Sequence, residues 1–150
     1  MKRGITLSRL VMLCLVVTTI SPTFAAAADP DPDKVAESIM VNGSFTAKIY
    51  FASNDRSYTG FDAAAAASIQ PELTWADGDA VAQGVANIAQ VNAAGTRVML
   101  ETLSASGTSF CIAHRPAKRQ GPGTVRGMDS AGGTFGTYVG CKNAPSGSWG

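Results

Sequence analysis

The sequence is poor in the residues that carry most catalytic and metal chemistry. It has one histidine, His114, and three cysteines. Structural zinc sites need several His or Cys ligands, which this chain lacks once its cysteines pair. No G-x-S-x-G elbow, S-x-x-K motif, Walker motif or dinucleotide-binding motif occurs in it. We therefore expect a protein that is not an enzyme and holds no cofactor or metal.

The chain also lacks a charge excess of either sign. Charged residues make up 15% of it, with 12 basic and 11 acidic side chains. Lys2, Arg3 and Arg9 lie at the extreme N-terminus, and the rest of the chain has nine basic residues against 11 acidic ones, a net charge of −2. Such a balance argues against nucleic acid or anionic membranes as partners.

The charges are unevenly distributed along the chain. Acidic side chains dominate from Asp29 to Asp79, whereas basic ones dominate from Arg97 onward. One interpretation is an ordinary solvated surface. The other is a molecule with two oppositely charged ends, suited to packing against copies of itself or other partners.

No apolar run is long enough for a comfortable membrane span. The run from Leu10 to Ile20 falls short of the about 20 residues that cross a bilayer. It follows a basic start and precedes Ala25–Ala28, the order typical of a secretory signal peptide. We predict a signal peptide over residues 1–28, cleaved between Ala28 and Asp29, with Ala26 as the rival position. The product would be secreted, periplasmic or at the cell surface, with no membrane span after cleavage.

Cysteine usage agrees with export. Cys14 leaves with the signal peptide, so Cys111 and Cys141 form an even pair in an oxidising compartment. We predict a structural disulfide between them, worth about 3.5 kcal/mol in chain entropy. A reactive pair of free thiols is the alternative, and no C-x-x-C spacing supports it.

The sequence that follows the predicted signal peptide predicts one domain that begins with a helix. Residues 29–34 read as an extended tether, in which Pro32 and Asp33 suit a first helical turn. The domain then covers residues 35–150. Asn42-Gly43 predicts a weak point in the helix, and Ser53-Asn54-Asp55 predicts its end. At helical spacing one apolar face of the helix would consist of Val35, Ile39, Val41, Phe45, Ile49 and Ala52.

A sheet is predicted in the second half. After a short alanine-rich helix capped by Asp62, strands are expected over residues 81–91, 96–103 and 108–114, with a fourth near Val125 or Tyr138. In the second of these, Val98, Leu100 and Thr102 face one side, and Arg97, Met99 and Glu101 the other. The prediction is an α+β fold: an N-terminal helix packed on a three- to four-stranded antiparallel meander, with a C-terminal disulfide loop and a flexible tail.

Three segments resemble the globular head of a bacterial type IV pilin or pseudopilin. Residues 47–61 resemble the end of the pilin helix, residues 106–113 the strand with the first cysteine, and residues 129–133 the stretch before the second cysteine. Lys2–Leu7 is similar to a prepilin peptidase site. The anchor departs from the family pattern, because Arg9 stands where glutamate is expected and Pro22, Pro30 and Pro32 interrupt the long helix.

The resemblance implies a secreted or cell-surface protein that acts by protein–protein contacts in a type IV pilus, a pseudopilus or adhesion. Its partners would be envelope proteins or other copies of the same chain. The alternative is a free secreted module that binds a ligand or an inhibitor target without joining a filament.

Few other residues are candidates for a site. His114 is expected at the surface or at a sheet edge. Asp29, Asp31 and Asp33 begin like a calcium loop, but Lys34 and Met40 occupy its glycine and glutamate positions. Asp77-Gly78-Asp79 reads as a plain turn. The aromatic residues Trp75, Trp149, Tyr58 and Tyr138 are expected in the core or at an edge.

Overall fold

The structure is a computed structural model that describes residues 29–78, 81–116 and 123–150. The predicted signal peptide, with Cys14 and Ala28, lies outside these residues. Asp29, on the far side of the predicted cleavage position, is exposed at the start of the described chain. Within the described ranges, no helix has both the length and the apolarity that a membrane crossing requires.

The first helix, α1, runs from Pro32 to Ser53. Asp31 caps it by accepting a hydrogen bond from the Asp33 amide at 3.0 Å, and proline is favourable at the first position. Residues 32–34, placed at the end of the tether by the sequence, form the first turn of this helix. The helix continues through Gly43 and ends where predicted.

The predicted apolar face of α1 is wrong except at Ile39, which is partly buried against the core. Val35, Val41, Phe45 and Ile49 are exposed. The face that packs against the sheet is instead built from small residues and one methionine: Ala36, Met40, Gly43 and Ala47. A Cβ atom on Gly43 would lie 3.0 Å from Leu100 Cδ1, so glycine allows the helix to approach the sheet closely.

A short second helix, α2 (Ala63–Ile69), follows, and Asp62 caps it through a 2.8 Å hydrogen bond from the Ala65 amide. Five strands then form one sheet in sequence order. They are β1 (Thr74–Asp77), β2 (Val85–Val91), β3 (Val98–Leu103), β4 (Ser109–His114) and β5 (Thr124–Asp129). The last helix is α3 (Tyr138–Lys142).

The sheet corrects the predicted fold class in one respect. Strands β2 to β5 form the expected antiparallel meander, but β1 adds a fifth strand that pairs in parallel with β2. The seven residues between β1 and β2 are enough to carry the chain back along so short a strand. The fourth antiparallel strand lies at Val125, whereas Tyr138 begins a helix.

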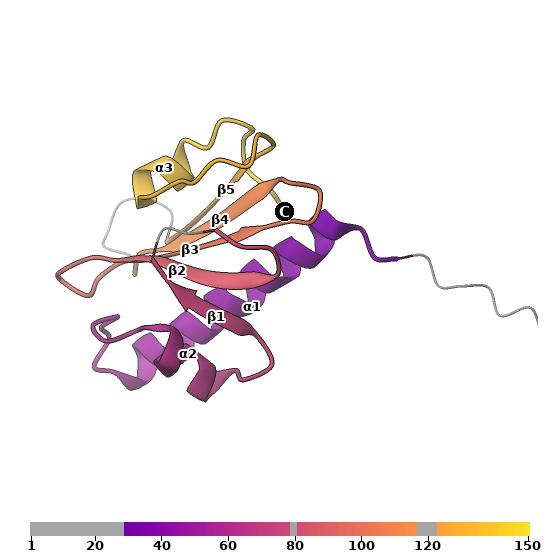
Figure 1. Cartoon of the computed structure of the whole chain (residues 1–150). Coiled ribbons are helices and arrows are strands. Elements are labelled where there is room, and N and C mark those ends of the chain that lie inside the picture. The colour runs from indigo at the N-terminus through magenta and orange to yellow at the C-terminus, as the bar shows by residue number, and fades with distance from the viewer. Residues whose placement is uncertain (1–28, 79–80, 117–122) are drawn as a thin grey trace, which may run out of the picture.

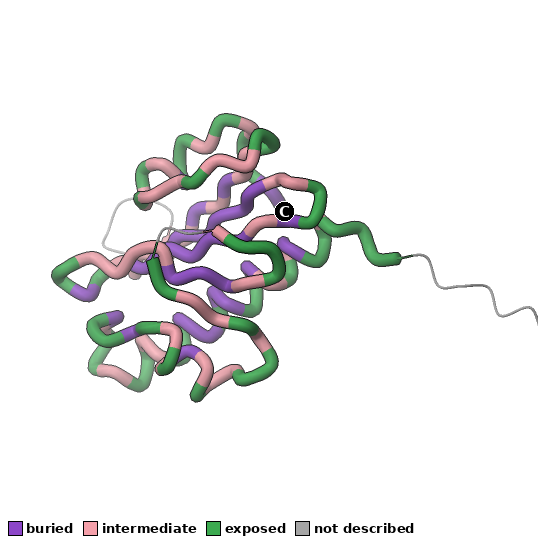
Figure 2. The backbone as a smooth tube through the Cα atoms, in the orientation of Figure 1, coloured by how far each residue is buried: buried purple, intermediate pink, exposed green. Residues whose placement is uncertain are grey.

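The two faces of the sheet carry separate cores. In Figure 1, α1 crosses one face, α2 lies beside β1 and α3 lies at the β5 end. Alternation along β3 divides the strand as predicted: Val98 and Leu100 pack in the α1 core, and Met99 packs in the core beneath α3. Buried residues accordingly follow the strands and the inner side of α1 (Figure 2).

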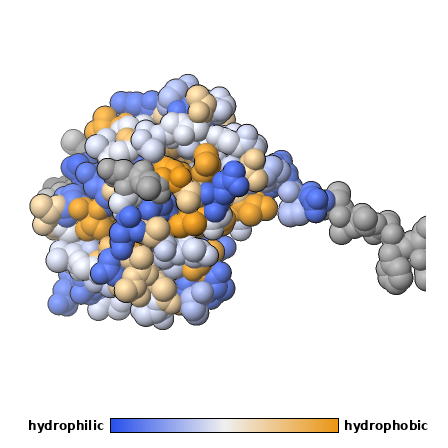
Figure 3. Space-filling view, in the orientation of Figure 1, coloured by the Kyte–Doolittle hydropathy of each residue, from blue (hydrophilic) through white to orange (hydrophobic). Residues whose placement is uncertain are grey.

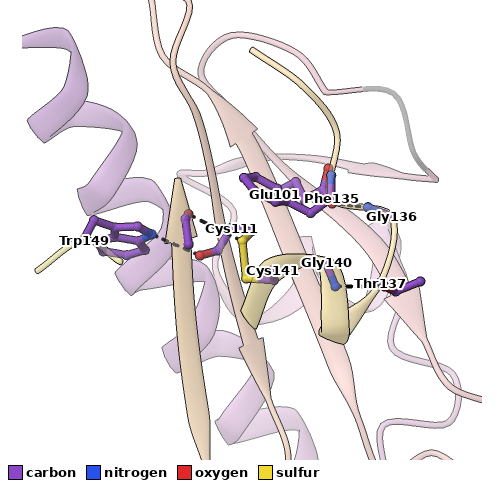
Figure 4. Close-up of a disulfide and its surroundings, with 9 residues drawn as sticks. Glu101, Cys111, Phe135, Gly136, Thr137, Gly140, Cys141 and Trp149 are labelled. Carbon is purple, nitrogen blue, oxygen red and sulfur yellow. Dashed lines mark hydrogen bonds between the residues drawn. A yellow bond between two sulfur atoms is a disulfide. The ribbon is translucent and has the colours of Figure 1, made fainter. Parts of the chain in front are cut away.

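The predicted disulfide joins β4 to α3. Cys111 and Cys141 are both fully buried, with Cα atoms 5.8 Å apart. Gly127 of β5 lies against it, because a Cβ atom there would be 3.0 Å from Cys111 Sγ. The disulfide therefore fixes α3 on the face of the sheet opposite α1 (Figure 4).

Candidate binding site

A groove of about 680 Å³ runs beside β5, the last strand of the sheet. One wall is α1, another is β5 itself, and the C-terminal segment with Lys142 of α3 completes it. Its lining residues are Val41, Ser44, Phe45, Lys48, Ile112, Thr124, Val125, Arg126, Lys142, Ser148, Trp149 and Gly150. This volume lies within the range of ligand pockets in proteins.

The exposed side of α1, which includes the helix wall of the groove at Val41 and Phe45, carries apolar side chains. Val41, Phe45 and Ile49 recur every four residues, so they form a row along one side of α1. Their exposed fractions are 45%, 64% and 40%. With these exposed fractions, the row is apolar surface that the fold leaves open to solvent. Other hydrophobic residues form separate patches on the face shown in Figure 3.

Trp149 forms the floor of the groove. Its indole Nε1 donates a 3.1 Å hydrogen bond to the Cys111 carbonyl (Figure 4). The ring also meets Phe110 edge-on, with the two ring centres 6.0 Å apart. The Arg126 guanidinium lies 5.0 Å from the centre of the indole ring, in cation–π contact. These contacts hold both the ring and the charged group in place.

The groove is lined by positive charge. Lys48, Arg126 and Lys142 line it, and none of its lining residues has a carboxylate side chain. Lys48 and Lys142 are exposed, so their ammonium groups remain hydrated. A ligand that combines apolar and negatively charged groups is the chemical complement of this lining.

Ser44 adds a polar group without a partner. The residue is 5% exposed, and among the described residues its hydroxyl has no hydrogen-bond partner. A buried hydroxyl left unpaired costs free energy. Ser44 lines the groove, but its hydroxyl oxygen is closed off from solvent.

The predicted candidate residues do not gather at this groove. His114 lies at the end of β4, where its Nδ1 hydrogen-bonds the hydroxyl of the fully buried Tyr58. Burial, and secondly the charge of Lys48, lower the pKa of His114. Burial likewise raises the pKa of Tyr58 above its ordinary value. The pair therefore consists of a neutral imidazole and a protonated phenol at neutral pH.

The aromatic residues are dispersed. Trp75 donates from its indole to the Gln70 carbonyl at 3.0 Å, in the region of α2. Tyr138 of α3 lies beneath the guanidinium groups of Arg97 and Arg115, at 5.7 and 5.9 Å from its ring centre. Only Trp149 among the predicted aromatic candidates contributes to the groove.

A buried carboxylate holds the loop before α3. Glu101 is fully buried, and its Oε1 accepts hydrogen bonds from the amides of Phe135 and Gly136 at 3.1 and 2.9 Å (Figure 4). Two amide donors on one oxygen fix the entrance to α3. This residue is better explained as a structural anchor than as a reactive group.

The acidic residues do not assemble a metal centre in the described part of the chain. Asp31 caps α1, and Asp33 accepts a 2.5 Å hydrogen bond from the Ser106 hydroxyl. Hydrogen bonds from Ser104 and Ser106 lower the pKa of Asp33. Asp77 accepts from the Ala63 amide, while Asp79 lies outside the described residues. No group of three or more His, Cys, Asp or Glu residues is close enough together there to hold a metal ion.

Comparisons with protein-family models, curated proteins and solved structures found no match.

Sequence reasoning missed the groove. It placed Val41 and Phe45 in the core. It expected an irregular tail, and residues 144–150 form no helix or strand, but it did not foresee that this tail bonds to β5. In the structure the tail pairs with β5, since the Met128 amide donates to Gly147 and the Met128 carbonyl accepts from Ser146. The available sequence signal was an excess of large apolar residues in α1 over what one helix face can bury.

Proposed function

We propose that the protein is an exported, pilin-like binding protein that acts by protein–protein contacts at the cell surface or in the cell envelope. A helix on an antiparallel meander, followed by a segment tied back by Cys141, is the order that the resemblance to pilin heads implies. The buried disulfide supports export, because disulfides persist in oxidising compartments.

The observation that carries the proposal is the exposed apolar row of α1. Val41, Phe45 and Ile49 lie outside the core although equally apolar residues pack within it. Exposed apolar patches with polar surroundings are typical of interaction sites. A contact with an envelope partner, or with another copy in a pilus or pseudopilus, would bury this row.

A free secreted binding module is the second candidate. The groove beside β5 favours it, because its walls and charges all come from one chain. Such a module would need no filament, and adhesion or inhibition would follow from ligand capture alone.

Cell fractionation tests the proposal. The native protein is expected in the envelope or in sheared surface filaments, and Phe45→Ser should reduce that association without unfolding the domain. Asn42→Ser, an exposed polar change on the same helix, is the matched control. A protein found only as a monomer in the medium would favour the free module, and one found reduced in the cytoplasm would contradict export.

A further inference from the structure

The outer edge of β5 offers backbone hydrogen-bonding groups to the groove. Met128 uses its outward amide and carbonyl to pair with the tail at Gly147 and Ser146, at 3.0 and 3.1 Å. Alternate residues of a strand direct their backbone groups to the same side. The backbone groups of Thr124 and Arg126 therefore also face away from β4, toward the groove.

Beyond Gly147 the tail passes Arg126 without pairing to its backbone, and Trp149 and Gly150 lie against the Arg126 side chain. Within the part of the chain that the structure describes, no backbone hydrogen bond joins Thr124 or Arg126 to the tail. Trp149 instead turns under the Arg126 side chain. An extended segment can therefore continue the pairing that the tail begins at Met128.

We propose that this groove binds an extended acidic peptide segment of a protein partner, which adds to β5 as an edge strand. The proposal rests on the function in protein–protein contacts given above and names its partner chemistry. Backbone pairing with Thr124 and Arg126 provides the affinity, as in other cases of strand addition. Carboxylates on the α3 side of the segment meet Lys142, while Lys48 on the α1 side adds to the positive potential of the groove.

The apolar part of the groove determines which side chains the segment carries between its acidic residues. Successive side chains of a strand point to opposite faces, so a segment that alternates acidic and apolar residues presents two different surfaces. Its apolar side chains pack on Val41, Phe45 and Trp149.

Calorimetric titration with synthetic peptides tests this assignment. The probe is acetyl-Glu-Val-Glu-Val-Glu-amide, and its control has lysine in place of each glutamate. The glutamate peptide is expected to bind and the lysine peptide to fail. Higher salt should weaken binding, since exposed charges are screened. Equal binding of both peptides, or of neither at millimolar concentration, would overturn the proposal.

Charge-reversal variants locate the binding. Lys142→Glu and Lys48→Glu should each weaken binding of the glutamate peptide at least about threefold, the scale of exposed ion pairs. Lys34→Glu, an equal charge change outside the groove, should leave it unchanged. If all three variants bind like the original protein, the groove is not the site.

Backbone pairing between the peptide and β5 can be tested separately from charge. On peptide binding, NMR amide shifts should change most at Thr124 and Arg126, and a peptide N-methylated at alternate residues should bind more weakly. Unchanged affinity for the methylated peptide, or equal binding of octanoate, would exclude strand addition. A protein that associates with the envelope but binds no acidic peptide would contradict this inference alone. Peptide binding by a protein that is a free monomer would contradict only the filament role.

Discussion

At the residue scale, the Tyr58–His114 pair links stability to pH. Burial lowers the pKa of His114 in the folded state below its ordinary value of 6.5, so the folded protein binds this proton less readily than the unfolded chain. The stability from His114 is complete above pH about 6.5 and is lost as the pH falls through the lower folded value. A protonated Nδ1 also no longer accepts from the Tyr58 hydroxyl.

His114→Gln tests this linkage, because a side-chain amide keeps an acceptor for Tyr58 but does not titrate. Urea unfolding is measured for both proteins between pH 5 and 7.5. The stability advantage of the original protein over the variant should shrink as the pH falls. Parallel pH profiles would show that His114 titrates equally in the folded and unfolded states.

At the element scale, the disulfide decides whether α3 stays on the sheet. Glu101 fixes the loop before this helix, and Gly127 leaves room for the Cys141 carbonyl. A five-residue helix has little stability of its own. Its position therefore depends on the Cys111–Cys141 bond and on these neighbours.

Replacing both cysteines by alanine should lower the free energy of unfolding by about 2–4 kcal/mol, the usual contribution of such a disulfide. The urea midpoint measures the loss. The original protein treated with a reductant is the control, because it loses the same bond without a change of sequence. In the variant, the amides of Phe135 and Gly136 should exchange hydrogen faster. An unchanged midpoint would mean that the core beneath α3 holds this helix without the bond.

At the scale of the whole molecule, Trp149 joins distant parts of the chain. It is 5% exposed, bonds to Cys111 of β4 and packs in the same core as Met40 of α1. The last described residues thereby close the domain against its first helix. The groove depends on this closure, because Trp149 is its floor.

Trp149→Ala should cost about 3–5 kcal/mol of unfolding free energy, as for other large core aromatics. Trp149→Phe should cost less, since it keeps most of the packing and loses the indole donor. Thermal unfolding measures both, with Val139→Ala on the exposed side of α3 as the control. A loss at Trp149 no greater than at Val139 would contradict its role as the closing residue.

Much of the local structure could be predicted from the sequence, since it depends on neighbouring residues. Asp62 capped its helix, Ser53 ended α1, and the alternation of Val98, Met99 and Leu100 divided β3 between two cores. The cysteine pair followed from the even count that remains once Cys14 is assigned to the predicted signal peptide. The pilin resemblance, the signal peptide and the absence of enzyme activity stay predictions.

Three features could be seen only in the tertiary structure, because each depends on contacts between distant residues. Periodicity gives α1 an apolar surface, but closeness to Leu100 selected the small residues around Gly43 for the core and left Phe45 outside. The parallel pairing of β1 with β2 depends on where the two strands come together in the folded chain. The groove exists only because the tail returns to β5 and brings Trp149 between the strand and the first helix. Local sequence fixes how each segment folds, whereas the burial of surfaces against one another decides which residues remain available to a partner.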